Sequence, residues 1–424
     1  MKIHVSGSNL VTTFADQMKP FCYFGNNCRD HFDGTLFRFP FRNDTTAAQS
    51  EISKCQAAKG EAIDLLITNF KNAIKKAPLF LRNVKRIEMY YEGEGDSDFP
   101  ELLYFAEVSD RKKVAGEGRS ESQFSGFHHM KTLANVYGMG GMTTQNEWTS
   151  ISDFIAGSHA NPIGKDAFYS KLLQTPESKL PKTQHVVTVA FCERKQPTKG
   201  TQRSKSETPL DLSALNVQKE GSVDEESFEV SPVGPAGQTS LALKQDEFIS
   251  VVDEYLILTS LGGGRCQIMA CNPKYRHMKL LPWGGVAAHL TRNGKPAPPC
   301  NGSAFCFLPM PAETGLPVHI NGYFELSSNR RDIWWGDDMT GEGKIRCEWN
   351  SSLLNDVIAP LYVNLVLLAG RIIGPAQYSA LFPIQSKNEV WKLIVKEFYH
   401  ECERRGKFLV ALYLFDCSVI QGFS

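Results

Sequence analysis

The spacing of apolar residues predicts strands and helices in the first two thirds of the chain and helices in the last third. Between Ala62 and Ala77 apolar side chains recur every three or four residues, which predicts an amphipathic helix. Helical spacing returns from Ser352 onward and again over Val390–Cys402. Strands are predicted over Thr35–Phe41, Asn83–Tyr91, Leu102–Val108, His185–Cys192 and Glu247–Ser260.

The stretch Lys279–Trp335 is dense in Gly, Pro and aromatic residues. Ala304–Leu308 and Val318–Leu326 are rich in residues that favour strands, whereas Pro309–Pro317 has three prolines and a glycine. We therefore expect two strands with a tight return between them. Ser327–Asn329 then resembles a helix N-cap that would hold Arg330 and Arg331 at the start of the next element.

One segment departs from the composition of a packed domain. Arg194–Ser240 is rich in Ser, Thr, Pro, Gly and charge, and it cannot bury enough apolar surface to offset its backbone entropy. Because predicted strands lie on both sides, we expect residues 194–240 to be a disordered insertion within one domain. Arg111–Gln123 is predicted to be a polar loop, and the apolar run Phe408–Ser424 ends abruptly.

Charge and composition exclude several classes of partner. The 424 residues hold 46 Lys+Arg and 46 Asp+Glu, so no overall field attracts nucleic acid or an acidic membrane. The most apolar region, Val357–Ile373, is interrupted by Pro360, Asn364 and Arg371, which favours a buried helix over a membrane span. With no recognisable signal peptide, we expect a cytoplasmic protein without nucleic-acid or membrane partners.

The candidate reactive residues do not form a recognisable catalytic or metal motif. The 11 cysteines lack CxxC pairs, so reduced buried thiols are expected rather than disulfides or a zinc site. His128 and His129 have no accompanying nucleophile motif, since G-x-S-x-G does not occur. We predict no catalytic residue and no metal.

Long ordered motifs resemble the sacsin family. LPWGGVAAHL, FCFLPMPAETGLPVHINGYFELSSNRRDIW and WNSSLLNDVIAPLYVNLV match the sacsin internal repeat in order and spacing. Phe14–Arg42, FADQMKPFCYFGNNCRDHFDGTLFRFPFR, with Ser50–Ser53 after it, resembles the segment that closes the family's heat-shock-protein-90-like ATPase domain. Phe408–Ser424 departs from the family, which suggests a truncation or an altered reading frame.

The resemblance implies an α+β fold of three parts. Residues 1–110 would be the C-terminal part of a heat-shock-protein-90-like ATPase domain. Residues 111–350 would be a transducer-like mixed sheet domain that carries the disordered insertion. Residues 351–424 would form C-terminal helices that are truncated.

The family's nucleotide-binding parts are missing from this sequence. An Asn helix for magnesium, a D-x-G-x-G-like turn for adenine and a glycine-rich lid should precede the GTLFRFPFR run, and none does. The glycine clusters at 93–95, 138–141 and 262–264 are interpreted as turns rather than phosphate loops. We therefore expect no intrinsic enzyme activity and no cofactor, with ATP and magnesium relevant only if an upstream ATPase segment exists.

Arg330 and Arg331 are the candidate nucleotide-sensing residues of a complete protein. In the resembled superfamily a basic residue of the second domain reaches the terminal phosphate, and a guanidinium offers a matching fork of donors. Within this chain, pairing with Asp332, Asp337 or Asp338 is the alternative that we favour.

Three functional hypotheses follow. The first is a sacsin-like chaperone or co-chaperone module that binds seventy-kilodalton heat-shock chaperones or client proteins without ATPase activity. The second is part of an ATP-hydrolysing chaperone whose nucleotide site is completed by an upstream segment or another chain. The third is a non-functional fragment.

Overall fold

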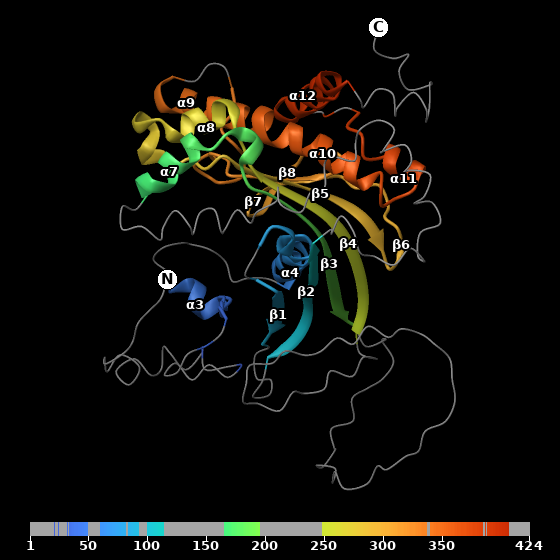
Figure 1. The fold of residues 1–424 in the computed structure, drawn as a ribbon. Helices are drawn as coiled ribbons and strands as arrows, with labels where there is room; N and C mark the ends of the chain where they lie inside the picture. The colour runs from blue at the N-terminus through green and yellow to red at the C-terminus, as the bar shows by residue number, and fades with distance from the viewer. Residues whose placement is uncertain are drawn as a thin grey trace, which may run out of the picture. The chain divides into compact units, whose positions relative to one another are not determined.

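The computed structural model describes residues 34–49, 60–81, 84–92, 100–113, 165–195, 248–336, 340–384 and 388–406, with residues 21, 24, 32 and 386. It is a mixed α+β structure built on a mixed sheet and helices (Figure 1). His128, His129, the glycine clusters at 93–95 and 138–141, residues 196–240 and Phe408–Ser424 lie outside the described residues.

The chain divides into two compact units whose segments interleave along the sequence. Unit 1 comprises Met1–Ile67, Tyr90–Leu103 and Glu193–Ile249, and unit 2 comprises Thr68–Met89, Tyr104–Cys192 and Ser250–Ser424. The boundaries expected after residues 110 and 350 stay a prediction.

Unit 1 contains little regular structure among its described residues. Helix α3 (Asp44–Ala48) begins where the Asn43 side chain accepts a hydrogen bond from the Thr46 backbone N–H at 2.9 Å, a normal N-cap. The first half of α4 (Gly60–Ile74) also belongs to this unit. Most of its apolar side chains stay exposed, whereas Ile74, in unit 2, is buried.

The sheet lies mainly in unit 2. Its order is β1-β2-β3-β4-β5-β9-β7-β8, and β6 pairs with β5. The strands are β1 (Arg86–Tyr91), β2 (Glu101–Lys113), β3 (Lys182–Arg194), β4 (Phe248–Leu261), β5 (Trp283–Arg292), β6 (Lys295–Pro296), β7 (Ser303–Cys306), β8 (Leu308–Glu313) and β9 (His319–Gly322).

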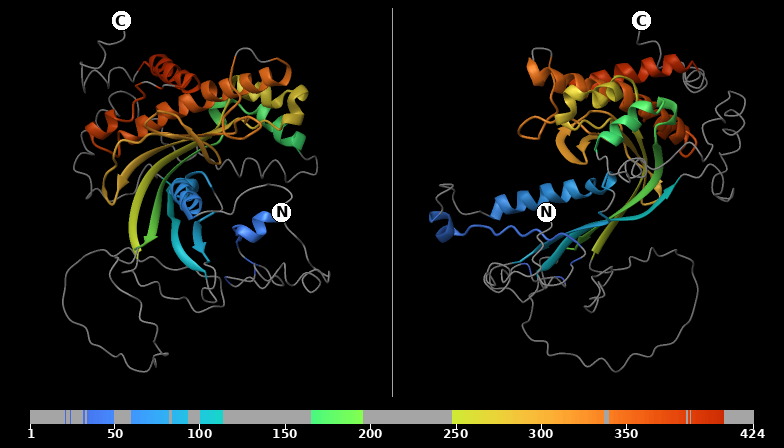
Figure 2. Two further views of the ribbon diagram at one scale, coloured as in Figure 1. Left: turned by 180° about the vertical axis from the view of Figure 1, so that it is seen from behind. Right: turned by 60° about the vertical axis from the view of Figure 1, so that its left-hand side comes forward.

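The helices of unit 2 cover one face of this sheet (Figures 1 and 2). They are α7 (Lys165–Gln174), α8 (Gly264–Cys271), α9 (Gly341–Leu353), α10 (Ala359–Ala369), α11 (Pro375–Ser379) and α12 (Glu389–Arg405). A core of apolar side chains that includes Leu258, Trp349 and Tyr362 fills the space between helices and sheet. The helices predicted from Ser352 onward are thus present and pack against the sheet.

A π-helical turn, η8 (Leu354–Ile358), joins α9 to α10 and presses closely on the sheet. A Cβ on Gly262 would lie 2.1 Å from Val357 Cγ2, and one on Gly284 would lie 3.0 Å from Val357 Cγ1. Glycine is therefore required where η8 meets β5 and the end of β4.

Among the described residues, one helical run, Gly341–Ala369, is long and apolar enough to span a membrane. However, 72% of its most apolar stretch is buried inside the fold. This burial is typical of a core helix.

The other sheet face carries a smaller apolar cluster. Leu79 and Phe80, at the end of the 3₁₀ turn η2 (Ala77–Leu79), pack on Val187, Ile257 and Phe305. The Phe80 and Phe305 rings meet edge to face with their centroids 5.0 Å apart.

The predicted strands over 83–91, 102–108, 185–192 and 247–260 are confirmed as β1, β2, β3 and β4. β3 and β4, which flank the predicted insertion, are neighbours in the sheet. The loop predicted from Arg111 is wrong for its first three residues, because β2 continues to Lys113.

The strand predicted over Thr35–Phe41 is wrong. These residues pair with no strand in the described part of the chain, and the Phe37 and Phe39 side chains are exposed. Pro40 has no N–H to donate to a ladder, which disfavours pairing on that side.

The tight return predicted over Pro309–Pro317 is also wrong. Strand β8 lies inside it and pairs antiparallel with β7, whereas β7 and β9 run parallel. Pro309 and Pro311 are tolerated because β8 is the last strand of the sheet, where a missing N–H costs no ladder hydrogen bond.

Candidate functional site

The segment that carries the two candidate arginines is a short hairpin after β9. Leu326 and Ile333 form an antiparallel bridge, and the Ser327 N–H donates to the Asp332 carbonyl at 2.8 Å. The helix N-cap predicted at Ser327–Asn329 is therefore wrong. Asn329 Oδ1 instead accepts from the Arg331 N–H at 2.9 Å and closes a turn.

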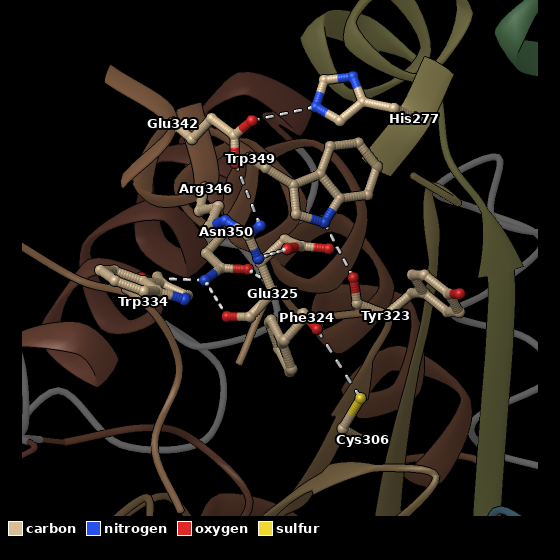
Figure 3. A network of polar contacts seen from close by, with 10 residues as sticks. All are labelled: His277, Cys306, Tyr323, Phe324, Glu325, Trp334, Glu342, Arg346, Trp349 and Asn350. Atoms are coloured by element: carbon tan, nitrogen blue, oxygen red, sulfur yellow. Dashed lines mark hydrogen bonds and ion pairs between the residues drawn. The ribbon is translucent and has the colours of Figure 1, made fainter. Parts of the chain in front are cut away.

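Asn350 of α9 fixes this hairpin to the helical layer (Figure 3). Its Oδ1 accepts from the Glu325 N–H, and its Nδ2 donates to the carbonyls of Glu325 and Trp334, each at 2.9 Å. Asn350 is fully buried, so the three hydrogen bonds form away from water and leave no amide group unused.

Neighbouring side chains of α9 extend the attachment. The Trp349 indole donates to the Tyr323 carbonyl at 2.9 Å, and Arg346 forms an ion pair with Glu325 at 2.5 Å (Figure 3). Burial raises the pKa of Glu325, Arg346 lowers it and Glu342 raises it further, with a net shift upward. The outer pair, His277–Glu342 at 3.4 Å, is exposed and adds little.

Arg330 and Arg331 lie at the exposed tip of this hairpin. The backbone of Arg330 is left-handed, with φ 55°, and its N–H donates to the Ser327 carbonyl. No ion pair with Asp332 is present among the described residues, and Asp337 and Asp338 lie outside them. The alternative of acidic pairing is thus not realised within the part of the chain that the structure describes.

The Gly262–Gly264 cluster lies at the start of helix α8. Its anion-binding position is nevertheless filled, because Asp356 of η8 accepts from the Cys266 N–H at 3.0 Å at the start of α8. A Cβ on Gly263 would meet the Glu177 side chain at 2.5 Å. Two carboxylates beside the glycines would repel a phosphate, so this geometry favours the turn interpretation.

A second polar cluster lies at the β7 end of the sheet. His319 Nδ1 accepts from the Ser303 N–H at 3.0 Å, His319 Nε2 lies 3.6 Å from Cys300 Sγ, and Lys76 Nζ donates to Ser303 Oγ at 3.1 Å. Burial lowers the pKa of His319 to about 3, with Lys76 and His289 adding to the effect. Burial also raises the pKa of Cys300, so this thiol is not an activated nucleophile.

Asp253 joins the same region to β5. It contacts His289 at 3.0 Å and Arg292 at 2.8 Å. Burial raises the pKa of Asp253, but the hydrogen bonds with His289 and Arg292 outweigh it and the net shift is downward. No group of three or more His, Cys, Asp or Glu side chains in the described part of the chain could hold a metal ion.

Sequence reasoning missed Asn350 and His319. Asn350 begins an Asn-Ser-Ser sequence, but its buried and fully bonded amide cannot serve as a glycosylation acceptor. The available signal was a polar residue between apolar neighbours in a helical pattern. His319 gave a similar signal, because it is a polar residue between Val318 and Ile320 in a predicted strand.

Comparison with known proteins identifies the N-terminal part. Residues 1–104 match the family model described as Sacsin domain. Residues 1–104 of this chain are therefore similar to the Sacsin domain family. Human sacsin is 42% identical over 113 residues, which cover 27% of this chain and 2% of human sacsin. No solved structure matches the chain.

The matched sacsin segment and the arginine hairpin are separate parts of the sequence. The segment contains the GTLFRFPFR run, α3, α4 and β1, whereas Arg330 and Arg331 lie outside it. The chain spans about 2% of the length of the curated relative that it matches, so activity and partners are treated below as proposals.

Proposed function

We propose that this sacsin-family chain is a chaperone or co-chaperone module in protein folding quality control. It would bind a partner chaperone of the seventy-kilodalton heat-shock class or a client protein in the cytoplasm. It would have no ATPase activity of its own, because its sequence lacks the nucleotide-binding parts. The proposal rests on the family match together with one surface of unit 1.

That surface is a run of exposed aromatic side chains within the matched segment. Phe37 is 72% exposed, Phe39 is 75% exposed and Phe41 is 41% exposed. We call these three residues the Phe strip. Its Phe37 and Phe39 rings are stacked, with centroids 6.4 Å apart. Aromatic side chains left in water in this way are typical of protein-binding surfaces.

The Phe strip is tied to unit 1 at its neighbouring residues. Arg38 pairs with Glu92 at 3.1 Å, and Asn43 caps α3 directly after the strip. Leu65 and Leu66 on α4 are further exposed apolar residues of the same unit. The exposed aromatic rings are therefore available for an apolar segment of another protein.

The test compares the full chain with a Phe37→Ser/Phe39→Ser variant. We expect the wild type to suppress aggregation of a heat-unfolded client enzyme without nucleotide, or to retain a seventy-kilodalton heat-shock chaperone in a pull-down. The variant should lose most of this activity. Ile384→Ser is the matched control, because it removes a side chain that is 80% exposed but lies outside the matched segment.

Loss of activity in the control as well would mean that general surface hydrophobicity is responsible. If wild type is inactive in both assays, the proposal is wrong. Circular dichroism of each variant should be unchanged, since the substituted side chains are exposed and contribute little packing.

The second candidate is a part of an ATP-hydrolysing chaperone whose nucleotide site is completed by an upstream segment or another chain. It is favoured by the exposure of Arg330 and Arg331 at the tip of an anchored hairpin. Calorimetric titration with ATP and magnesium should give no heat with this chain alone. An ATPase segment added in trans should be stimulated by wild type and not by Arg330→Ala/Arg331→Ala.

A further inference from the structure

A small cavity lies on the sheet face that carries the Leu79 and Phe80 cluster. It has a volume of about 40 Å³ and lies over β3 and β4 where β5 begins. It is lined by the apolar residues Leu79, Phe80, Val187 and Ile257 and by Thr183, His185, Thr259 and Trp283. All of these residues belong to unit 2.

The two threonines of this cavity share one hydrogen bond. Thr183 Oγ1 and Thr259 Oγ1 lie 2.6 Å apart, and both residues are buried. One hydroxyl donates to the other, so the pair keeps one hydroxyl hydrogen and several lone pairs. The pair can therefore accept a hydrogen bond from a group inside the cavity.

Trp283 contributes a buried donor without an acceptor. Its side chain is 6% exposed, and its Nε1 has no hydrogen-bond partner among the residues that the structure describes. Trp349 differs, because its Nε1 donates to the Tyr323 carbonyl. A buried N–H left unpaired is destabilising, and an incoming acceptor would offset this cost.

We propose that this cavity, the Thr–Trp pocket, binds a primary carboxamide group. The amide oxygen would accept from Trp283 Nε1–H, and the amide nitrogen would donate to the threonine oxygens. Among the described lining residues there is no Lys or Arg, so with His185 neutral a carboxylate would lack a compensating charge. A pocket of about 40 Å³ admits a few heavy atoms, whereas benzene needs a cavity of about 150 Å³.

The carboxamide could belong to an Asn or Gln side chain of a protein or to a free amide, because both present the same donor and acceptor groups. The pocket is distinct from the Phe strip, so its test does not depend on the chaperone proposal. His185 also lines the pocket, and measurements should therefore be made well above the ordinary pKa of histidine.

The experiment follows the tryptophan indole N–H signals of the ¹⁵N-labelled full chain during titration with acetamide. We expect the Trp283 signal, assigned with Trp283→Phe, to shift and saturate while the Trp349 signal stays in place. N,N-dimethylacetamide, which cannot donate, and acetate should bind at least tenfold more weakly. Thr259→Val should weaken acetamide binding, and Thr259→Ser should retain it.

Three results would overturn the proposal. These are an unmoved Trp283 signal, equal shifts of Trp283 and Trp349, or a long-lived water beside Trp283 that acetamide does not displace. If Trp283→Phe fails to fold, the Thr259 pair of variants still decides the question. A short glutamine peptide that binds more tightly than acetamide would identify a protein side chain as the source, and equal binding would identify a free amide.

Discussion

His319 accepts a hydrogen bond at Nδ1 from the backbone N–H of Ser303, at 3.0 Å, in a site where the imidazole is 1% exposed. Because the low pKa keeps the ring neutral and Nδ1 accepts, the ring proton lies on Nε2. The protonated Nε2 faces the sulfur of Cys300, so it cannot act as the base that removes the thiol proton. The Cys–His contact is thus structural and not a catalytic dyad.

The buried neutral His319 predicts acid sensitivity of the fold. The unfolded chain protonates this side chain below about pH 6.5, whereas the folded chain does so only near pH 3. Unfolding therefore takes up a proton between these values, and stability falls as pH drops, by up to about 1.4 kcal/mol per pH unit from this group. Denaturant unfolding of wild type and His319→Asn from pH 7 to pH 4 should show a shallower slope for the variant.

The exposed His277 provides the matched control for this experiment, since His277→Asn should leave the slope unchanged. Asp253, whose pKa is lowered, also adds acid sensitivity at lower pH, but equally in all three proteins. Equal slopes for wild type and His319→Asn would contradict the assignment.

Asn350→Leu should loosen the arginine hairpin. The substitution leaves the Glu325 N–H and two carbonyls without partners, at an expected cost of about 2–4 kcal/mol in the free energy of unfolding. Trypsin should then cleave after Arg330 or Arg331 faster than in wild type under native conditions. Asn388→Ala, which removes only the N-cap of α12, should cost about 1 kcal/mol without faster cleavage there.

Gly262→Ala should be strongly destabilising because of the close approach of η8. Its Cβ would overlap Val357 Cγ2, and overpacking of this kind costs about 1–3 kcal/mol or more. Gly374→Ala is the control, since no atom lies within 4 Å of its Cβ position. Thermal unfolding should place Gly374→Ala close to wild type, and comparable losses in the two variants would show that backbone entropy rather than contact with η8 is measured.

The sequence pattern predicted β1 to β4 and the C-terminal helices because each has a clear period or an uninterrupted apolar run. It failed over Pro309–Pro317, since proline content cannot distinguish a loop from an edge strand, and edge position is a property of the whole sheet. It failed at Thr35–Phe41 because alternation shows that a strand would have an apolar face, not that a partner exists to cover it.

The environment of Arg330 and Arg331 was not predicted. Ser327–Asn329 was interpreted as a helix N-cap, but the same residues suit an N-cap and an Asx turn equally well, and the structure has the turn. The hydrogen bonds of Asn350 join positions 16 and 25 residues apart, and local spacing carries no information on such contacts.

Asp356, which accepts a hydrogen bond from the Cys266 N–H at the start of α8, allows the effect of its charge to be separated from that of its hydrogen bond. Burial raises the pKa of Asp356, and the backbone N–H groups of Cys266 and Arg265 lower it, with a net shift upward. The fold therefore gains little from the negative charge itself. Asp356→Asn, which keeps an acceptor oxygen, should change the free energy of unfolding by less than about 1 kcal/mol, whereas Asp356→Ala should cost about 1–2 kcal/mol. Urea unfolding at pH 7 measures both. A loss for Asp356→Asn as large as that for Asp356→Ala would mean that the carboxylate charge, through the helix dipole, is what holds the Gly262–Gly264 turn in place.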